Sequence, residues 1–122
     1  MILADTSVWV DHLRSGDSRL AEELNGSTIV MHPFVAGELA LGSLTQREKV
    51  LGAIDSLPVA RVARVEEVRV LIEQRALFSR GIGYIDAHLL ASVLLTPSTL
   101  LWTRDKRLRV VAESLGLHAP FS

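Results

Sequence analysis

The sequence predicts an α/β domain in which a short parallel sheet is wrapped by helices. Two observations lead to this fold class. Segments with strand character alternate with segments of helical periodicity along the 122 residues, and each strand segment is short and apolar on both faces. Glycine and proline are spread evenly, and no repeat or linker-like stretch interrupts the chain. We therefore expect one domain that covers residues 1–122.

The first half of the chain is expected to supply two strands and the helices that follow them. Met1 to Ala4 are all apolar, and Asp5 behind them favours a helix start. Pro33 suits the first turn of another helix, and Thr45 with Glu48 has the spacing of a capping box. The expected elements are a strand at 1–4, helices at 8–13 and 18–24, a strand at 28–31, and helices at 33–41 and 45–54.

The second half continues the alternation of strands and helices. Val68, Leu71 and Ile72 have helical spacing, and Gly81 marks a break before the next helix. Gly116 suits the end of the last helix. The expected elements are a strand at 59–62, helices at 65–79 and 84–95, a strand at 99–102, a helix at 105–115 and a weak edge strand at 117–119.

The composition excludes several classes of protein. The longest apolar run is four residues, Met1 to Ala4, far below the roughly 18 that a membrane-spanning helix needs. This run leads directly into Asp5, unlike an export signal, so we expect a cytoplasmic protein without a membrane segment. The absence of cysteine excludes disulfides and thiolate ligands. Any metal must therefore be bound by oxygen or imidazole.

The net charge of −1 is the sum of two unlike halves. Residues 1–60 carry eight acidic and four basic residues, a net −4, whereas residues 61–122 carry six acidic and nine basic residues, a net +3. Eleven of the 13 basic residues are arginine, whose planar guanidinium suits phosphate and carboxylate partners, although ordinary solvated helix faces would also explain them. The near-zero total argues against a general nucleic-acid binder and leaves room for a local basic surface.

Four acidic residues stand at positions that suggest chemistry. Asp5 and Asp105 follow predicted strands, and open α/β sheets bind ligands outside the carboxyl ends of their strands. Glu38 and Asp86 lie in apolar stretches of predicted helices, where an ionised carboxylate is costly unless a positive charge compensates it. A shared divalent cation would explain all four. Taken singly, each also has a structural explanation as a helix cap, a solvated side chain or a charge near a helix start.

Four motifs stand out along the chain: Asp5-Thr6-Ser7 after the opening strand, Glu38 within Gly-Glu-Leu, the segment from Gly81 to Ser92 that contains Asp86, and the segment from Leu101 to Leu108 that contains Asp105. Together they resemble the PIN-domain family, and most closely the VapC-type toxins of bacterial toxin–antitoxin pairs. The resemblance covers nearly the whole chain, and the last two motifs are the most specific. It implies a three-layer α/β/α sandwich with a mainly parallel central sheet. It also implies a metal-dependent ribonuclease whose four acids surround Mg²⁺ or Mn²⁺.

The same resemblance implies supporting residues and partners. Thr6, Ser7 and Thr103 match polar positions beside the family acids, and Thr103 is the strongest candidate because it stands between a buried strand and Asp105. Thr6 and Ser7 would serve equally well as helix caps. Family likeness further implies a homodimer and a small VapB-like antitoxin protein that occludes the pocket, for instance by inserting an arginine among the carboxylates.

The chemistry of RNA cleavage fits these residue types. A divalent ion can activate water and stabilise negative charge on the phosphate without a strong base. Oxygen-only ligands select hard ions such as Mg²⁺ or Mn²⁺. Four converging carboxylates repel one another when no cation is bound, so at least one of them should have a raised pKa. One ion or two would both be compatible with this set of ligands.

Basic residues flank two of the four acids. Arg104, Lys106 and Arg107 surround Asp105, and Arg80 precedes the motif of Asp86. We expect them to form a basic rim that binds the RNA backbone, although ordinary helix-surface charge would give the same pattern.

Other functions have less support from the sequence. The four histidines lack zinc-motif spacing, and no G-x-S-x-G motif indicates a serine hydrolase. Aspartyl-phosphate transfer from Asp5 usually needs a second acid two residues later, where this chain has Ser7. The alternative from another class is a PIN-fold module that binds RNA or protein without cleaving it.

Overall fold

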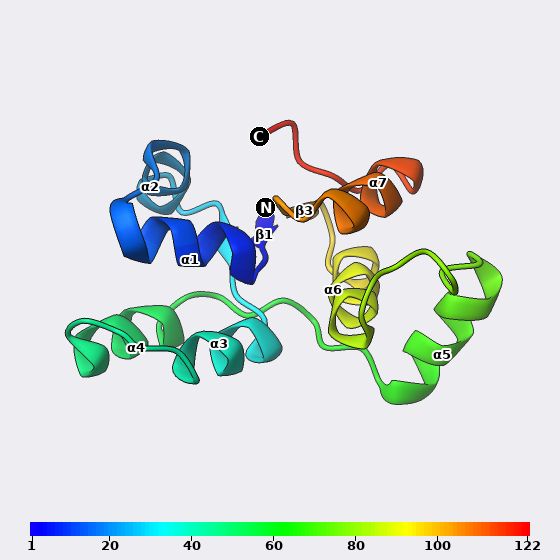
Figure 1. Ribbon diagram of the computed structural model, residues 1–122, viewed down its shortest axis with the longest axis horizontal. Coiled ribbons are helices and arrows are strands. Elements are labelled where there is room, and N and C mark those ends of the chain that lie inside the picture. The colour runs from blue at the N-terminus through cyan, green and yellow to red at the C-terminus, as the bar shows by residue number, and fades with distance from the viewer.

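The computed structural model describes all residues 1–122 and has a parallel sheet at its centre (Figure 1). Strands β1 (Ile2–Ala4), β2 (Ile29–Val30) and β3 (Leu100–Trp102) lie in the order β2-β1-β3. Single parallel bridges extend the sheet at both edges, from Met31 to Val59 and from Leu101 to His118. The predicted parallel sheet is therefore confirmed.

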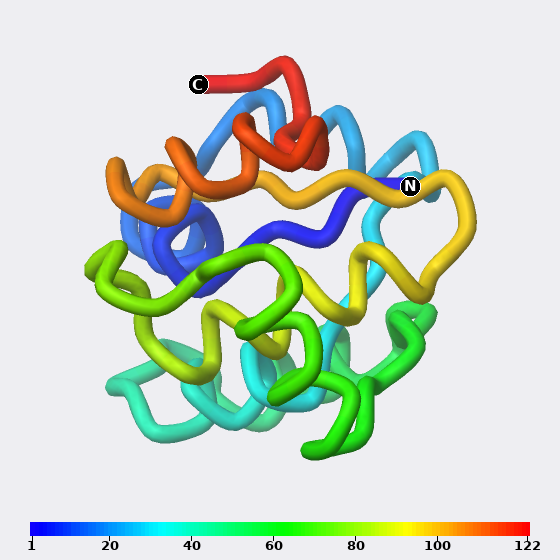
Figure 2. Tube along the Cα trace, turned by 90° about the vertical axis from the view of Figure 1, so that its right-hand side faces the viewer, coloured from blue at the N-terminus to red at the C-terminus, as the bar shows by residue number.

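Helices cover both faces of this sheet. One layer contains α1 (Thr6–Ser15), α2 (Ser18–Asn25), α3 (Pro33–Ala40) and α4 (Arg47–Asp55), which lie to the left in Figure 1. The other contains α5 (Val65–Gln74), α6 (Tyr84–Leu95) and α7 (Lys106–Ser114), to the right. Figure 2, which looks onto this second layer, shows β1 and β3 running side by side. This arrangement is the three-layer α/β/α sandwich that the family resemblance implied.

The strands are short and buried because helices pack against both sides of them. Leu3 and Ala4 of β1 and Leu101 and Trp102 of β3 have no exposed surface. Strands of this kind read as continuous apolar runs instead of alternating ones. None of the seven helices combines the length and the apolar character that crossing a bilayer requires.

Two predicted elements differ from the structure. The strand expected at 59–62 is only the bridge at Val59, since it lies at the sheet edge and the Arg61 amide donates to Thr96 Oγ1 (3.0 Å) instead of to a neighbouring strand. The helix expected at 65–79 ends at Gln74. Ala76 then adopts a left-handed conformation (φ 50°), and this turn brings Leu77 into the core.

A third difference concerns the start of α4. Gln46 precedes this helix with φ 54° and forms no side-chain cap, so the capping box predicted from Thr45 and Glu48 is wrong.

The order of the strands creates a switch point between β1 and β3. From β1 the chain passes through α1 and α2 to β2 on one side, and it later returns through α5 and α6 to β3 on the other side. The connections therefore diverge at the carboxyl ends of β1 and β3, which is where ligand sites of open α/β sheets form.

Candidate active site

Asp5 occupies the carboxyl end of β1 and caps α1. One carboxylate oxygen, Oδ1, accepts hydrogen bonds from the amides of Ser7 (3.0 Å) and Val8 (3.4 Å) and from the Ser7 hydroxyl. The other, Oδ2, accepts from the hydroxyl of Thr103. Burial raises the pKa of Asp5, and the hydrogen bonds from Ser7, Thr103 and Val8 oppose that shift. The cap and the candidate ligand are thus the same side chain.

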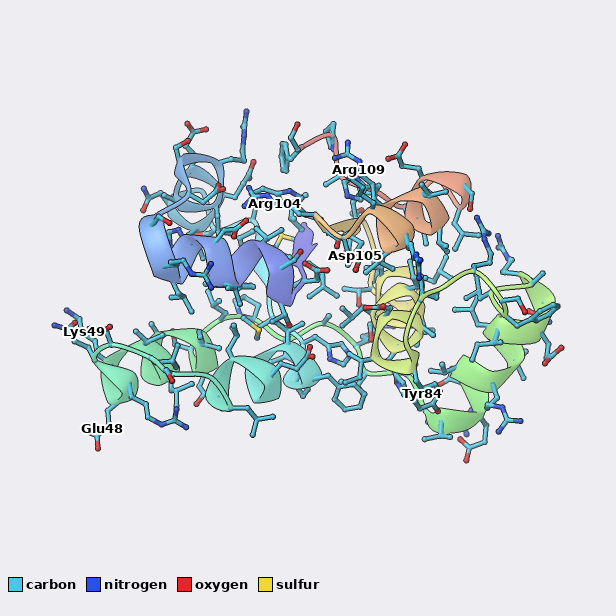
Figure 3. All side chains as sticks on the ribbon, viewed as in Figure 1. Glu48, Lys49, Tyr84, Arg104, Asp105 and Arg109 are labelled. Atoms are coloured by element: carbon cyan, nitrogen blue, oxygen red, sulfur yellow. The ribbon has the colours of Figure 1, made fainter.

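Thr103 connects Asp5 to the second strand-end acid. Its fully buried hydroxyl donates to Asp5 and accepts from the Asp105 amide (3.0 Å). Asp105 caps α7 through Oδ1, which accepts from the Leu108 amide (3.0 Å). Figure 3 shows Asp105 at the start of α7, above α6. The supporting role predicted for Thr103 therefore has a geometric counterpart.

Glu38 reaches the same region from α3. The hydroxyl of Thr6, the first residue of α1, donates to Glu38 Oε1 (2.7 Å). Glu38 is exposed, and Gly37 beside it adds no side chain. Thr6 and Ser7, which were expected either to support the acids or to cap the helix, therefore each bind one of the candidate acids.

Asp86 stands at the start of α6, in the other helix layer. Its Oδ2 accepts from the Gly83 amide (2.9 Å), which caps the helix. Burial raises the pKa of Asp86, and the negative charges of Asp105, Asp5 and Glu38 raise it further against the effect of the Gly83 hydrogen bond. Asp105, Asp5 and Glu38 therefore lie near enough to Asp86 for their charges to affect its pKa.

The four carboxylates do not form a closed metal cage. No group of three histidine, aspartate or glutamate side chains is placed to hold a metal ion. The donor set nevertheless fits a hard divalent ion, because all four groups supply oxygen and a cation would relieve their repulsion. Glu38, Asp86 and Asp105 each have one carboxylate oxygen that accepts no hydrogen bond from the protein.

The basic residues of the predicted rim differ in their partners. Arg80, Lys106 and Arg107 form no ion pair, and Arg107 lies against the loop before Asp86, where a Cβ on Gly81 would come within 2.7 Å of its Cδ. Arg104 instead forms ion pairs with Asp11 and Asp17. Three rim residues thus carry unpaired charge, and the fourth does not.

Comparison with known proteins agrees with this set of site residues. The family model described as PIN domain matches residues 2–114, a span that contains all four acids. This chain belongs to the PIN-domain family. It is 47% identical over 117 residues to proteins named Ribonuclease VapC32 in two strains of Mycobacterium tuberculosis, and the alignment covers 96% of this chain and 94% of each relative. The resemblance to the VapC branch of the PIN-domain family is thereby confirmed.

The PIN domain also contains a contact that we did not predict. The Thr103 amide donates to His118 Nε2 (3.2 Å), so the C-terminal segment holds the residue that joins Asp5 and Asp105. The available signal was the weak edge strand expected at 117–119. Its pairing with β3 places His118 opposite Leu101, two residues from Thr103.

Proposed function

We propose that this chain is a Mg²⁺- or Mn²⁺-dependent endoribonuclease that acts as the toxin of a toxin–antitoxin pair. The observation that supports the proposal is that Thr103 joins Asp5 and Asp105 at the carboxyl ends of β1 and β3, and that the charges of these two acids and of Glu38 raise the pKa of Asp86. RNA as the substrate is supported by relatives named as ribonucleases. An RNA target is consistent with the cytoplasmic location expected from the sequence.

Asp5, Glu38, Asp86 and Asp105 would hold the ion. A divalent ion bound there would supply positive charge that offsets the charge of the scissile phosphate, and it would lower the pKa of the attacking water so that this water loses its proton more readily. The protein contributes orientation. Hydroxyl and amide donors fix one oxygen of Glu38, Asp86 and Asp105, and the other oxygen of each remains available to a ligand.

Asp5 is the most tightly held of the four acids. Ser7 and Thr103 bind different oxygens of its carboxylate, so its plane is fixed before any ligand arrives. A preset carboxylate lowers the reorganisation that catalysis requires. We assign Ser7, Thr6 and Thr103 to this supporting role, the first two by contact with Asp5 and Glu38 and the third by contact with both strand-end acids.

A cleavage assay tests the proposal. Purified protein is incubated with structured RNAs in Mg²⁺ or Mn²⁺, with and without EDTA, alongside Asp5→Asn and Asp105→Asn. We expect cleavage that chelation and either substitution abolishes. Cleavage that survives all three would exclude the metal mechanism. Failure of the wild type to cut any RNA would favour the binding module without nuclease activity.

Three basic residues are proposed to bind the RNA backbone beside the acids. Arg80, Lys106 and Arg107 carry charge that no acidic side chain neutralises, and neutralising phosphates releases counterions. Arg107→Gln should weaken RNA binding and reduce its salt dependence by about one phosphate contact. An unchanged salt slope would remove Arg107 from the rim.

A groove beside Glu38 is proposed as the antitoxin site. It has a volume of about 500 Å³, and half of its lining residues are apolar, among them Val10, Leu13, Leu39 and Val50 of α1, α3 and α4. A segment seated there would pass Glu38 and block the acids. Co-purification with the product of the neighbouring open reading frame tests the partnership, and Leu13→Glu should release that partner.

A second groove is proposed as the homodimer contact. It measures about 190 Å³, lies between α5 and α6, and exposes Val70, Leu94 and Leu95. Exposed apolar surface of this kind is typical of protein contacts. Light scattering should give a dimer for the wild type and a monomer for Leu94→Glu. A monomeric wild type would contradict the dimer.

A further inference from the structure

We infer that Arg104 is a positioning residue of this site, which ties the turn that carries Thr103 and Asp105 to helices α1 and α2. The inference rests on the proposed function and assigns Arg104 a role other than binding RNA. Figure 3 shows Arg104 between β3 and the α1–α2 pair, whereas Arg109 lies farther along α7.

Each of the three guanidinium nitrogens of Arg104 donates a hydrogen bond. Nη1 donates to Asp11 Oδ2 (2.7 Å), Nη2 donates to Asp17 Oδ2, and Nε donates to the carbonyl of Ser122 (3.2 Å). The guanidinium carbon lies 5.3 Å from the centroid of the Trp102 ring. Only arginine offers a planar set of donors that can meet these partners at once.

These contacts join four parts of the chain. Asp11 belongs to α1, Asp17 caps α2, Ser122 ends the C-terminal segment, and Arg104 itself follows β3. The Asp17 side chain is 15% exposed and that of Arg104 is 27% exposed, so solvent competes weakly for the pair. Burial alone would raise the pKa of Asp17, but the Leu20 amide and Arg104 together lower it.

The backbone of the same residue enters the network around Asp5. The Arg104 amide donates to Ser7 Oγ (3.0 Å), and the Ser7 hydroxyl donates to Asp5. Helix α1 is therefore fixed to the β3–α7 turn at two places, near its start through Asp5 and Ser7 and farther along through Asp11. Two attachment points set the orientation of α1 relative to Asp105. With one point alone, α1 could pivot about it.

This arrangement makes Arg104 a poor ligand for phosphate. Two carboxylates already neutralise its charge, and an RNA phosphate would have to displace them and approach their negative charge. Arg107 differs because it forms no ion pair. The two arginines are therefore expected to affect different kinetic constants.

The test compares Arg104→Met, Arg104→Lys and Asp11→Asn with the control Arg109→Met. Arg109 is an α7 arginine with a single surface ion pair, to Glu113 (2.7 Å). Each variant is assayed for kcat and KM in RNA cleavage, for the salt dependence of RNA binding, for Mn²⁺ affinity by calorimetry and for Tm. Assays are run well below the Tm of the least stable variant.

We expect Arg104→Met to lower kcat and Mn²⁺ affinity by about 10- to 100-fold, the range typical of residues that orient metal ligands. KM and the salt slope should stay close to wild type. Arg104→Lys and Asp11→Asn each keep part of this network and should show smaller losses of kcat and Mn²⁺ affinity. They also test the inference if Arg104→Met does not fold. Arg109→Met should match the wild type.

Three results would overturn the inference while leaving the proposed function intact. They are an unchanged kcat in the Arg104 variants, a raised KM with a reduced salt slope, and an equal loss in Arg109→Met. A wild type that neither cleaves RNA nor binds Mn²⁺ would overturn the proposed function itself, and the inference with it.

Discussion

The hydroxyl of Thr103 donates a hydrogen bond to the carboxylate of Asp5, although 98 positions separate the two residues in the chain. The pairing of β1 with β3 makes this contact possible, because the two strands end at the paired residues Ala4 and Trp102, and Asp5 and Thr103 come next in each. The same hydroxyl accepts from the Asp105 amide. One buried side chain therefore sets the spacing of the two strand-end acids.

Replacing Thr103 by valine should preserve its shape and remove this connection. Asp5 would lose a donor and the Asp105 amide an acceptor, at a cost of about 1–3 kcal/mol for an unsatisfied buried group. We expect kcat to fall by about 10- to 100-fold. Thr99→Val is the matched control, since Thr99 is also buried on the β3 side of the fold but bonds only the Pro97 carbonyl (3.1 Å). Equal kinetics for the two variants would contradict the role of Thr103.

Asp5→Asn and Asp17→Asn should change stability in opposite directions. Both residues cap helices, and asparagine caps equally well. Burial raises the pKa of Asp5, so its ionised form destabilises the fold at pH 7, whereas the pKa of Asp17 is lowered and its ionised form stabilises the fold above the unfolded-state pKa. In EDTA, Asp5→Asn should raise the Tm by a few degrees and Asp17→Asn should lower it.

The effect of Asp5→Asn should shrink as the pH falls toward 4, because the carboxylate of Asp5, whose pKa is raised, then takes up a proton. The effect of Asp17→Asn should persist at that pH, because the lowered pKa of Asp17 keeps its carboxylate ionised. Thermal unfolding followed by circular dichroism at pH 7 and pH 4.5 measures the Tm of both variants and of the wild type. A decrease in Tm for Asp5→Asn at pH 7 would show that the ionised carboxylate is not a net cost to the fold.

His32 should make the fold sensitive to mild acid. It is fully buried, its Nδ1 accepts from the Phe34 amide (3.0 Å) and its Nε2 lies 3.0 Å from Ser92 Oγ. Burial and the nearby His88 lower its pKa to about 4. Because the unfolded chain binds the proton near pH 6.5, stability is present above that pH and is lost as the pH falls toward 4.

The free energy of unfolding that is lost through His32 alone should reach about 2 kcal/mol between pH 7.5 and pH 5, at about 1.4 kcal/mol per pKa unit. Urea unfolding of wild type and His32→Asn isolates it, because asparagine keeps an acceptor at the helix cap and does not titrate. The stability difference between the two proteins should narrow by that amount on acidification. A difference that stays constant with pH would show that His32 does not titrate as described.

Gly81→Ala and Gly116→Ala separate backbone strain from the position of Arg107. Both glycines have left-handed φ angles, 78° and 70°, so alanine should cost each variant about 1–2 kcal/mol. Only at Gly81 would the new Cβ displace Arg107, whereas nothing lies within 4 Å at Gly116. Gly81→Ala alone should therefore weaken RNA binding and reduce its salt slope. The same RNA affinity in both variants would contradict a rim contact by Arg107.

Much of the fold was predictable because each strand is apolar throughout. Three of the four acids were predictable because they follow a strand or stand near a helix start, and Glu38 because it lies in an apolar stretch of α3. The absence of a full strand at 59–62 was not predictable, since pairing at a sheet edge depends on neighbours such as Thr96 that are distant in sequence. The pairing of Arg104 with Asp11 and Asp17 was also hidden, as it spans 93 and 87 positions. Local patterns therefore indicated which residues carry the chemistry, while the contacts that orient them arose from tertiary packing.

Cleavage of RNA with a sulfur in place of one non-bridging phosphate oxygen tests the central claim most directly. Sulfur binds Mg²⁺ poorly and Mn²⁺ better, because Mg²⁺ prefers hard oxygen ligands. If the four carboxylates hold an ion that contacts the scissile phosphate, sulfur in one of the two stereoisomers should slow cleavage in Mg²⁺. Mn²⁺ should restore that cleavage, and Asp86→Asn should abolish it in both ions. Two results together would contradict a metal-bearing active site. They are equal cleavage of the oxygen and sulfur substrates in Mg²⁺ for both stereoisomers, and cleavage that persists when EDTA removes the ion.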